Sequence, residues 1–191
     1  MSRLDLIVGP NGAGKSTFVE LVLTPSLPPG TGFVNADEIA KQRWPGAEQE
    51  HSYEAATIAS DTRERLITVK QSFIAETVFS HPFKLDLIDN ALAAGFTVKL
   101  HVIAIPAALA VARVRYRIVS GGHSVPPHKI VERYQRLWPL VAEAIRRVDS
   151  ADVWDNTRPS TPTKIAEFVG GLTISPPQWP AWIPGALRDL T

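Results

Sequence analysis

Residues 9–16, with the sequence GPNGAGKS, place glycines, one lysine and one hydroxyl in the spacing GxxxxGK[ST]. The glycines let backbone N–H groups approach a phosphate closely, and a helix that begins at such a loop adds a favourable dipole. We expect Lys15 to reach the β- and γ-phosphates of a nucleotide and the hydroxyl of Ser16 to hold Mg²⁺. The alternative interpretation is a glycine-rich turn that only connects a strand to a helix. The expected nucleotide-binding residues are Gly9, Pro10, Asn11, Gly12, Ala13, Gly14, Lys15, Ser16 and Thr17.

Two acidic residues follow short apolar stretches further along the chain. Asp37 comes after Phe33-Val34, and a carboxylate there can accept a hydrogen bond from an attacking hydroxyl and then its proton. The alternative is that Asp37 caps a helix starting at Glu38, because aspartate is a favoured N-cap. Glu76 ends an apolar strand, which indicates binding of substrate hydroxyls or of Mg²⁺-bound water, with a strand-end residue as the alternative. Thr77 beside it is expected to bind substrate, although threonine also suits a strand by propensity.

Four arginines flank a loop that contains Gly121-Gly122. Arg113 and Arg117 are four residues apart, and Arg133 and Arg136 are three apart, so each pair shares a helix face. Guanidinium groups suit bidentate phosphate contacts, and an arginine supplied to a phosphoryl-transfer transition state contributes about 10³–10⁵ in rate. We predict a catalytic role for the first pair and substrate binding for the second pair and for His123 in the loop. A solvated charged face is the alternative for each arginine.

The elements that must position these groups alternate along the chain. Such alternation predicts an α/β fold, a five-stranded parallel sheet with helices on both faces. Ligands bind beyond the carboxyl ends of the strands in such sheets, where the phosphate loop, both acids and Asp155-Asn156 all fall. The expected strands are residues 3–8, 33–34, 72–75, 96–105 and 151–154, and the expected helices are residues 15–23, 48–70, 82–94, 106–120, 128–148 and 163–169.

Length and composition limit the class of protein. The 191 residues suit a single α/β domain, which we place at 1–174, followed by a Pro- and Trp-rich tail at 175–191 packed on it. The absence of cysteine excludes disulfides and thiolate zinc sites. A net charge of +1 argues against binding of duplex nucleic acid. The longest apolar run, Val102 to Ala112, is shorter than the roughly 20 residues of a membrane span, so we expect a cytoplasmic protein without a membrane partner.

Several segments resemble the zeta-toxin family in order and content. They are GPNGAGKSTF, NADEIA, FIAETVFSHP, RVRYRIVSGGHSVP with KIVERYQR, and VWDN, and together they cover about residues 3–157. The resemblance implies a P-loop kinase fold with an arginine-bearing lid. Well-known members of the family phosphorylate the 3′-hydroxyl of UDP-N-acetylglucosamine with ATP or GTP, and an antitoxin protein commonly restrains them.

The resemblance also implies roles for individual residues. Each role belongs to the position in this chain that matches a family motif. By this resemblance, Lys15 and Ser16 are P-loop residues, Asp37 accepts the hydroxyl proton, Glu76 and Thr77 contact the sugar nucleotide, Arg113 and Arg117 stabilise the transferring phosphoryl group, and Asp155-Asn156 lies near the nucleotide base.

Residues and resemblance together predict a kinase that uses ATP or GTP with Mg²⁺ and phosphorylates a hydroxyl of a small molecule. A UDP-sugar is the first candidate acceptor, and an antitoxin is the first candidate protein partner. Two alternatives stay open. One is a nucleotide-dependent switch or regulatory ATPase, and the other is a kinase of a nucleoside, an antibiotic or a polynucleotide end.

Overall fold

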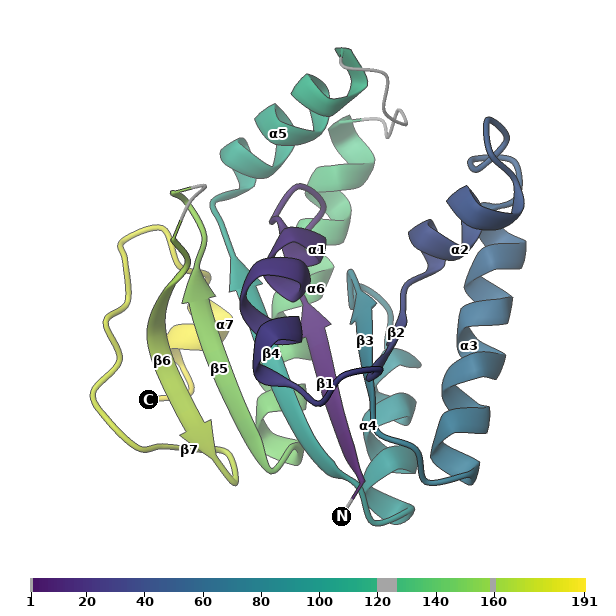
Figure 1. Ribbon diagram of the computed structural model, residues 1–191. Helices are drawn as coiled ribbons and strands as arrows, with labels where there is room; N and C mark the ends of the chain where they lie inside the picture. Colours follow the sequence, from purple (N-terminus) through teal and green to yellow (C-terminus); the bar gives the residue numbers. More distant parts are fainter. Residues whose placement is uncertain (1, 120–126, 159–160) are drawn as a thin grey trace.

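The computed structural model describes residues 2–119, 127–158 and 161–191, so His123 lies outside the described residues. Seven strands form one sheet in the order β2-β3-β1-β4-β5-β6-β7 (Figure 1). β2, β3, β1, β4 and β5 pair in parallel, whereas β6 and β7 are antiparallel. The strands are β1 Arg3–Val8, β2 Gly32–Val34, β3 Phe73–Thr77, β4 Thr97–Ala104, β5 Ser150–Asp155, β6 Thr163–Val169 and β7 Leu172–Thr173.

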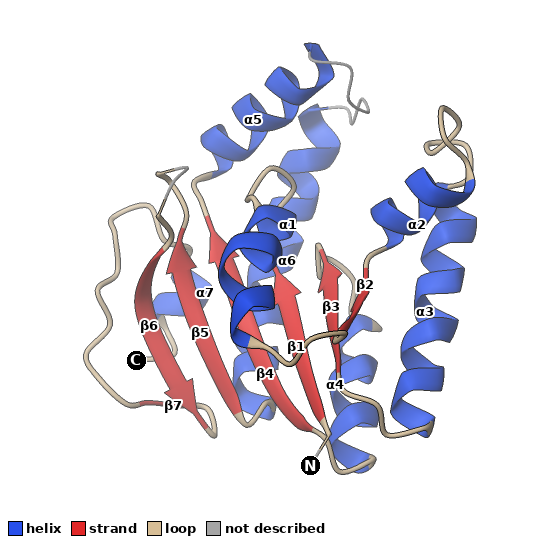
Figure 2. Cartoon of the chain, viewed as in Figure 1, coloured by secondary structure: helices blue, strands red, loops and turns tan. Residues whose placement is uncertain are grey.

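Helices cover both faces of this sheet (Figure 2). Alternation along the strands sorts the side chains, so that Leu100 and Val102 of β4 face one apolar core while Ile103 faces the other. The first core receives side chains from α3, α4, α6 and α7, and the second from α1, η1, α5 and the start of α6. The helices are α1 Lys15–Phe18, continued by the π-helical turn η1 Val19–Leu23 and the 3₁₀ turn η2 Thr24–Ser26, then α2 Ala36–Arg43, α3 Ser52–Thr68, α4 Lys84–Ala93, α5 Ala107–Val119, α6 Pro127–Arg147 and α7 Gly185–Arg188.

The predicted α/β class is confirmed, but the sheet has two strands more than expected. Residues 163–169, predicted as a helix, form β6 and pair with β5. Gly170 and Gly171 both have positive φ and turn the chain into β7, a hairpin signal that the sequence carried. The helix prediction failed because an open sheet edge beside β5 offered this segment backbone partners, and pairing there buries Phe168 completely.

The starting residues of two helices also differ from the sequence prediction. The sequence analysis included α2 only in the alternative interpretation of Asp37, as a helix starting at Glu38. In the structure α2 begins at Ala36. The long segment predicted over 48–70 becomes helical only at Ser52. α2 follows β2 directly, so it carries Asp37 at the carboxyl edge of the sheet.

The C-terminal segment returns to the face of the sheet that α6 covers. Ile183 and Leu187 are buried in that core, and Trp179 and Trp182 pack against it half-buried. One turn of this segment, α7, is helical. Within the described ranges, none of the helices combines the length and the apolar composition that crossing a membrane requires.

Candidate active site

The loop between β1 and α1 passes so close to its neighbours that a Cβ at two of its positions would collide with them. A Cβ on Gly9 would lie 2.3 Å from the backbone oxygen of Ile103. Gly14 has φ of +82°, in the left-handed region, and a Cβ there would lie 2.7 Å from Nδ2 of Asn156. These are the two fixed glycines of the GxxxxGK[ST] spacing. The structure therefore gives a steric reason for both, and they leave the backbone N–H groups accessible to a phosphate.

Lys15 and Ser16, at the start of α1, both contact Glu76 at the end of β3. The Ser16 hydroxyl donates to Oε2 of Glu76 at 2.9 Å, and Nζ of Lys15 lies 3.9 Å from Oε1. Nζ also donates to the carbonyl oxygen of Pro10 at 3.1 Å. The side chains of Lys15 and Glu76 are 8% and 9% exposed, so both charges are largely withdrawn from water.

Burial is the largest influence on the titration of both groups. It lowers the pKa of Lys15 and raises the pKa of Glu76, while their mutual attraction works in the opposite direction for each. The hydrogen bonds that Ser16 and Asn35 make to Glu76 favour its charged form. Burial makes an uncompensated positive charge on Lys15 costly. A triphosphate bound beside Lys15 would supply the compensating negative charge.

Asp37 lies in the first turn of α2 with an exposed side chain. Asn35, and not Asp37, caps this helix, because its Oδ1 accepts a hydrogen bond from the Asp37 N–H at 2.8 Å. The carboxylate of Asp37 is thus free of the capping role that sequence reasoning kept open. Its charge is close enough to raise the pKa values of both Lys15 and Glu76. Asn35 itself was not predicted, although an asparagine before a helix is a recognisable N-cap signal.

Thr77 and the turn after β3 are also constrained. The Thr77 Oγ1 accepts a hydrogen bond from the Phe79 N–H at 3.4 Å. Phe79 is completely buried and has φ of +60°, a conformation that costs a non-glycine residue about 1–2 kcal/mol. Such strain is typical of functional sites, and nothing in the sequence marked this residue.

The lid arginines occupy different environments. Arg113 of α5 donates to the backbone oxygens of Asn156 at 3.0 Å, Thr157 at 3.1 Å and Gly12 at 3.4 Å. Arg113 therefore ties the phosphate loop to the segment after β5 in this structure. Arg117 is exposed, and its positive charge contributes to lowering the pKa of Lys15.

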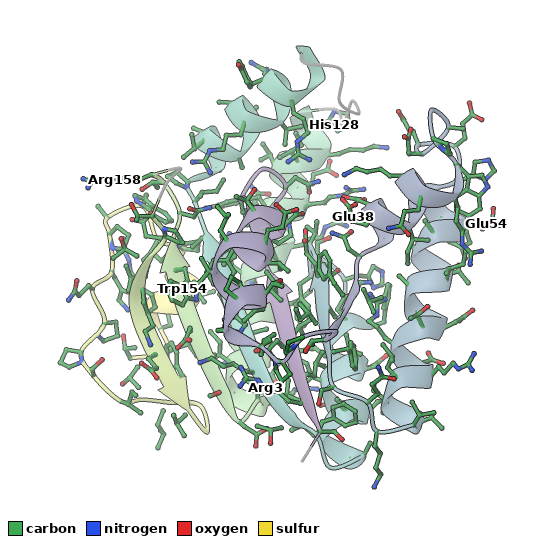
Figure 3. The ribbon with its side chains drawn as sticks, viewed as in Figure 1. Arg3, Glu38, Glu54, His128, Trp154 and Arg158 are labelled. Carbon is green, nitrogen blue, oxygen red and sulfur yellow. The ribbon has the colours of Figure 1, made fainter. Side chains whose placement is uncertain are left out.

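The second arginine pair lies on α6, where Arg133 is half-buried and Arg136 is exposed. Figure 3 shows the start of this helix, at His128, above the carboxyl ends of the strands. Glu38, in the first turn of α2, also lies above these strand ends in the same view. The lid helices and α2 thus both rise from the edge of the sheet where the phosphate loop lies.

Asn156, predicted near the nucleotide base, directly contacts the phosphate loop. It is buried, and its Nδ2 donates to the backbone oxygen of Ala13 at 2.6 Å. Together with the contacts of Arg113, this hydrogen bond braces the loop from the side of β5. The sequence could not reveal the brace, because it joins residues far apart in the chain.

The chemistry of these groups fits a magnesium nucleotide. Mg²⁺ is commonly held by one or two protein oxygens together with substrate phosphates, and Ser16 and Glu76 offer such oxygens beside the phosphate loop. Within residues 2–119, 127–158 and 161–191, no group of three or more His, Asp or Glu side chains could hold a metal ion without such help. A bound Mg²⁺ would neutralise phosphate charge during transfer.

The sheet order and the phosphate loop have the P-loop kinase fold, which belongs to the α/β class. A family model described as zeta toxin matches residues 3–160, and the chain belongs to this family. A comparison with curated protein sequences gave no match.

Solved structures with the same fold include a chain of a two-protein complex, a chain of a toxin–antitoxin system and several kinases. A chain of the AvrRxo1-ORF1:AvrRxo1-ORF2 complex with ATP has a TM-score of 0.70 at 18% identity, over 91% of this chain and 60% of that chain. A chain of the PezAT toxin–antitoxin system of Streptococcus pneumoniae has a TM-score of 0.61 at 12% identity, over 87% and 71%. A gluconokinase from Sinorhizobium meliloti has a TM-score of 0.54 at 16% identity, over 82% and 84%. The chain therefore spans less than two thirds of the first of these proteins.

Proposed function

We propose that the protein transfers the γ-phosphoryl group of ATP or GTP to a hydroxyl group of a small molecule. The observation that carries this proposal is the gathering of Asp37 and Glu76 around Lys15 and Ser16 at one edge of the sheet. Asp37 is exposed in the first turn of α2, where its carboxylate can accept the proton of an acceptor hydroxyl. Membership of the zeta toxin family supports the same class of reaction.

Each group has a distinct task in the proposed reaction. Lys15 and the loop backbone hold the β- and γ-phosphates, and Arg117 approaches the transferring phosphoryl group from the lid. Asp37 accepts a hydrogen bond from the acceptor hydroxyl and takes its proton as the new O–P bond forms and the bond to the β-phosphate oxygen breaks. Glu76 and Thr77 orient the acceptor, while Arg113 and Asn156 hold the loop in place.

UDP-N-acetylglucosamine is the first acceptor to test, on the ground of family membership. The same reasoning makes an antitoxin protein the first partner to test. It also makes the cytoplasm the compartment in which the protein would bind the acceptor and this partner. One similar fold comes from the PezAT toxin–antitoxin system and another from the two-protein AvrRxo1-ORF1:AvrRxo1-ORF2 complex, which motivates the search for a partner.

A screen of candidate acceptors with labelled ATP, Mg²⁺ and purified protein tests the proposal. Wild-type protein should label an acceptor, Lys15→Ala should label none, and Asp37→Asn should bind ATP normally but transfer about 10²–10⁴-fold more slowly. Unchanged transfer by Asp37→Asn would remove this residue from the mechanism. Nucleotide turnover that ignores every small molecule but responds to a protein would favour the switch instead.

A further inference from the structure

A tyrosine of α6 is hydrogen-bonded to the junction between β4 and α5. The Tyr134 hydroxyl donates to the backbone oxygen of Ile105 at 3.0 Å. Ile105 directly follows the last residue of β4 and precedes Pro106, after which α5 begins. Ile105 is completely buried, so its carbonyl oxygen needs a donor from within the protein. Tyr134 supplies that donor from a position 29 residues further along the chain.

Packing holds the Tyr134 ring at this junction. The side chain is half-buried and packs against both apolar cores. The ring of Trp138, which is almost completely buried, meets it edge-on with ring centroids 5.3 Å apart. Burial also raises the pKa of the Tyr134 hydroxyl, which keeps this group protonated and able to donate. The hydroxyl is therefore a permanent donor in a fixed place.

α6 contains a proline shortly after Tyr134. Pro139 has no N–H, and its ring clashes with the carbonyl group four residues earlier, which interrupts the helical hydrogen bonds of α6 at this point. The part of α6 before the interruption carries Arg133 and Arg136 and begins above the carboxyl ends of the strands (Figure 3). Tyr134 therefore fastens this part of α6 to the sheet and, by the same hydrogen bond, fixes the start of α5.

α5 in turn lies directly against the phosphate loop. A Cβ built on Gly12 would lie 3.0 Å from the backbone oxygen of Ala110 and 3.2 Å from Cβ of Arg113, both on α5. Figure 1 shows α5 rising from the end of β4 beyond the edge of the sheet. A helix moves largely as one body, so a displacement at its base changes its contact with Gly12 and the place of Arg117 further along it.

We propose that Tyr134 is a positioning residue, which holds the base of α5 and so places Arg117 for phosphoryl transfer. The effect on transfer rests on the proposed function, whereas the anchoring of α5 rests on the hydrogen bond and the packing alone. Tyr134 acts through α5 and not on the substrate. Loss of a hydrogen bond to a buried carbonyl changes an equilibrium about tenfold. The fraction of molecules with α5 correctly placed should fall by a similar factor when the hydroxyl is removed.

Hydrogen exchange of backbone amides tests the anchor without an assay of activity. Tyr134→Phe removes only the hydroxyl group and keeps the ring in both cores. The amides of α5 should exchange about tenfold faster in this variant, because local opening of the helix no longer breaks that hydrogen bond.

The control for exchange is Ile183→Val, which lowers stability by a similar amount through the first core, away from α5. Both variants should speed exchange of sheet amides that open only on global unfolding, but Ile183→Val should leave locally opening amides of α5 unchanged. Equal exchange of α5 in the two variants would overturn the anchor.

The rate of phosphoryl transfer separates positioning from a purely structural role. Well below the melting temperature every variant is folded, so a structural role alone would leave kcat unchanged. Tyr134→Phe should lower kcat about five- to tenfold and leave KM for the acceptor unchanged, because the affected arginine acts in the transition state. Tyr53→Phe removes the same hydroxyl from an exposed position on α3 and should keep wild-type kinetics. A wild-type kcat in Tyr134→Phe would overturn the positioning role.

A double-mutant cycle with Arg117→Met tests the route by which Tyr134 acts. In the Arg117→Met protein, adding Tyr134→Phe should change kcat by less than about twofold, since the arginine to be positioned is gone. The full five- to tenfold loss in both backgrounds would overturn the route through Arg117. If α5 shows the expected exchange but wild-type protein labels no acceptor, the anchor stands and the proposed kinase function fails.

Discussion

The contact between Gly14 and Asn156 can be tested with a double-mutant cycle. In the folded protein the amide of Asn156 donates to the buried oxygen of Ala13 and occupies the space that a Cβ on Gly14 would need. Asn156→Ala removes the donor but leaves the contacts of Arg113 intact, because those are made to backbone oxygens. A buried carbonyl that loses its partner costs about 2 kcal/mol. At about 2–4 °C per kcal/mol for a chain of this size, the melting temperature should fall by about 4–8 °C.

Gly14→Ala should be more destabilising on its own. Its φ of +82° costs an alanine about 1.5 kcal/mol, and the new Cβ would displace the Asn156 amide and break the same hydrogen bond, for a total of about 3.5 kcal/mol. In the double variant the hydrogen bond can be lost only once, and the Cβ occupies the space that the amide left. The expected total is again about 3.5 kcal/mol rather than the sum of about 5.5, which gives a coupling of about 2 kcal/mol.

Urea unfolding followed by tryptophan fluorescence measures these free energies. Equal slopes against urea for all four proteins would show that only stability has changed. Gly95→Ala is the matched control, because Gly95 also has φ of +82° but no atom lies within 4 Å of its ideal Cβ. It should cost only the backbone contribution and show no coupling to Asn156→Ala. Additivity of Gly14→Ala and Asn156→Ala within about 0.5 kcal/mol would refute the reasoning.

Three further predictions concern the charged groups. Arg117→Met should slow phosphoryl transfer about 10³-fold or more in the labelled-ATP assay while the exposed Arg115→Met does not, and equal rates would exclude Arg117 from the mechanism. Because burial raises the pKa of Glu76, wild-type protein should lose stability relative to Glu76→Gln as pH rises from about 4.5 through that pKa. Urea midpoints of both proteins measure this, and parallel stability curves against pH would contradict it. Burial lowers the pKa of Lys84 from its ordinary 10.5 to about 8, so wild-type protein should gain stability relative to Lys84→Met between about pH 8 and 10.5, and a flat difference would contradict this.

Local sequence patterns predicted much of this fold. The five parallel strands were placed because each is a short apolar run ended by a turn residue, and the family model and similar structures confirm the P-loop kinase class. The residues of the phosphate loop were readable because their glycines serve a backbone geometry that depends on near neighbours. Their roles in catalysis and substrate binding stay predictions until the variants above are measured.

What the sequence alone determined about this protein is therefore local: the phosphate loop, the alternation of strands and helices, and the acids at strand ends. Tertiary structure decided the features that depend on distant partners. Residues 163–169 became a strand because β5 offered an open edge, and Asn35 rather than Asp37 became the cap of α2. Arg113 and Asn156 braced the phosphate loop. The physical reason is that hydrogen bonds and charges act over a few ångströms in space, whatever their separation along the chain.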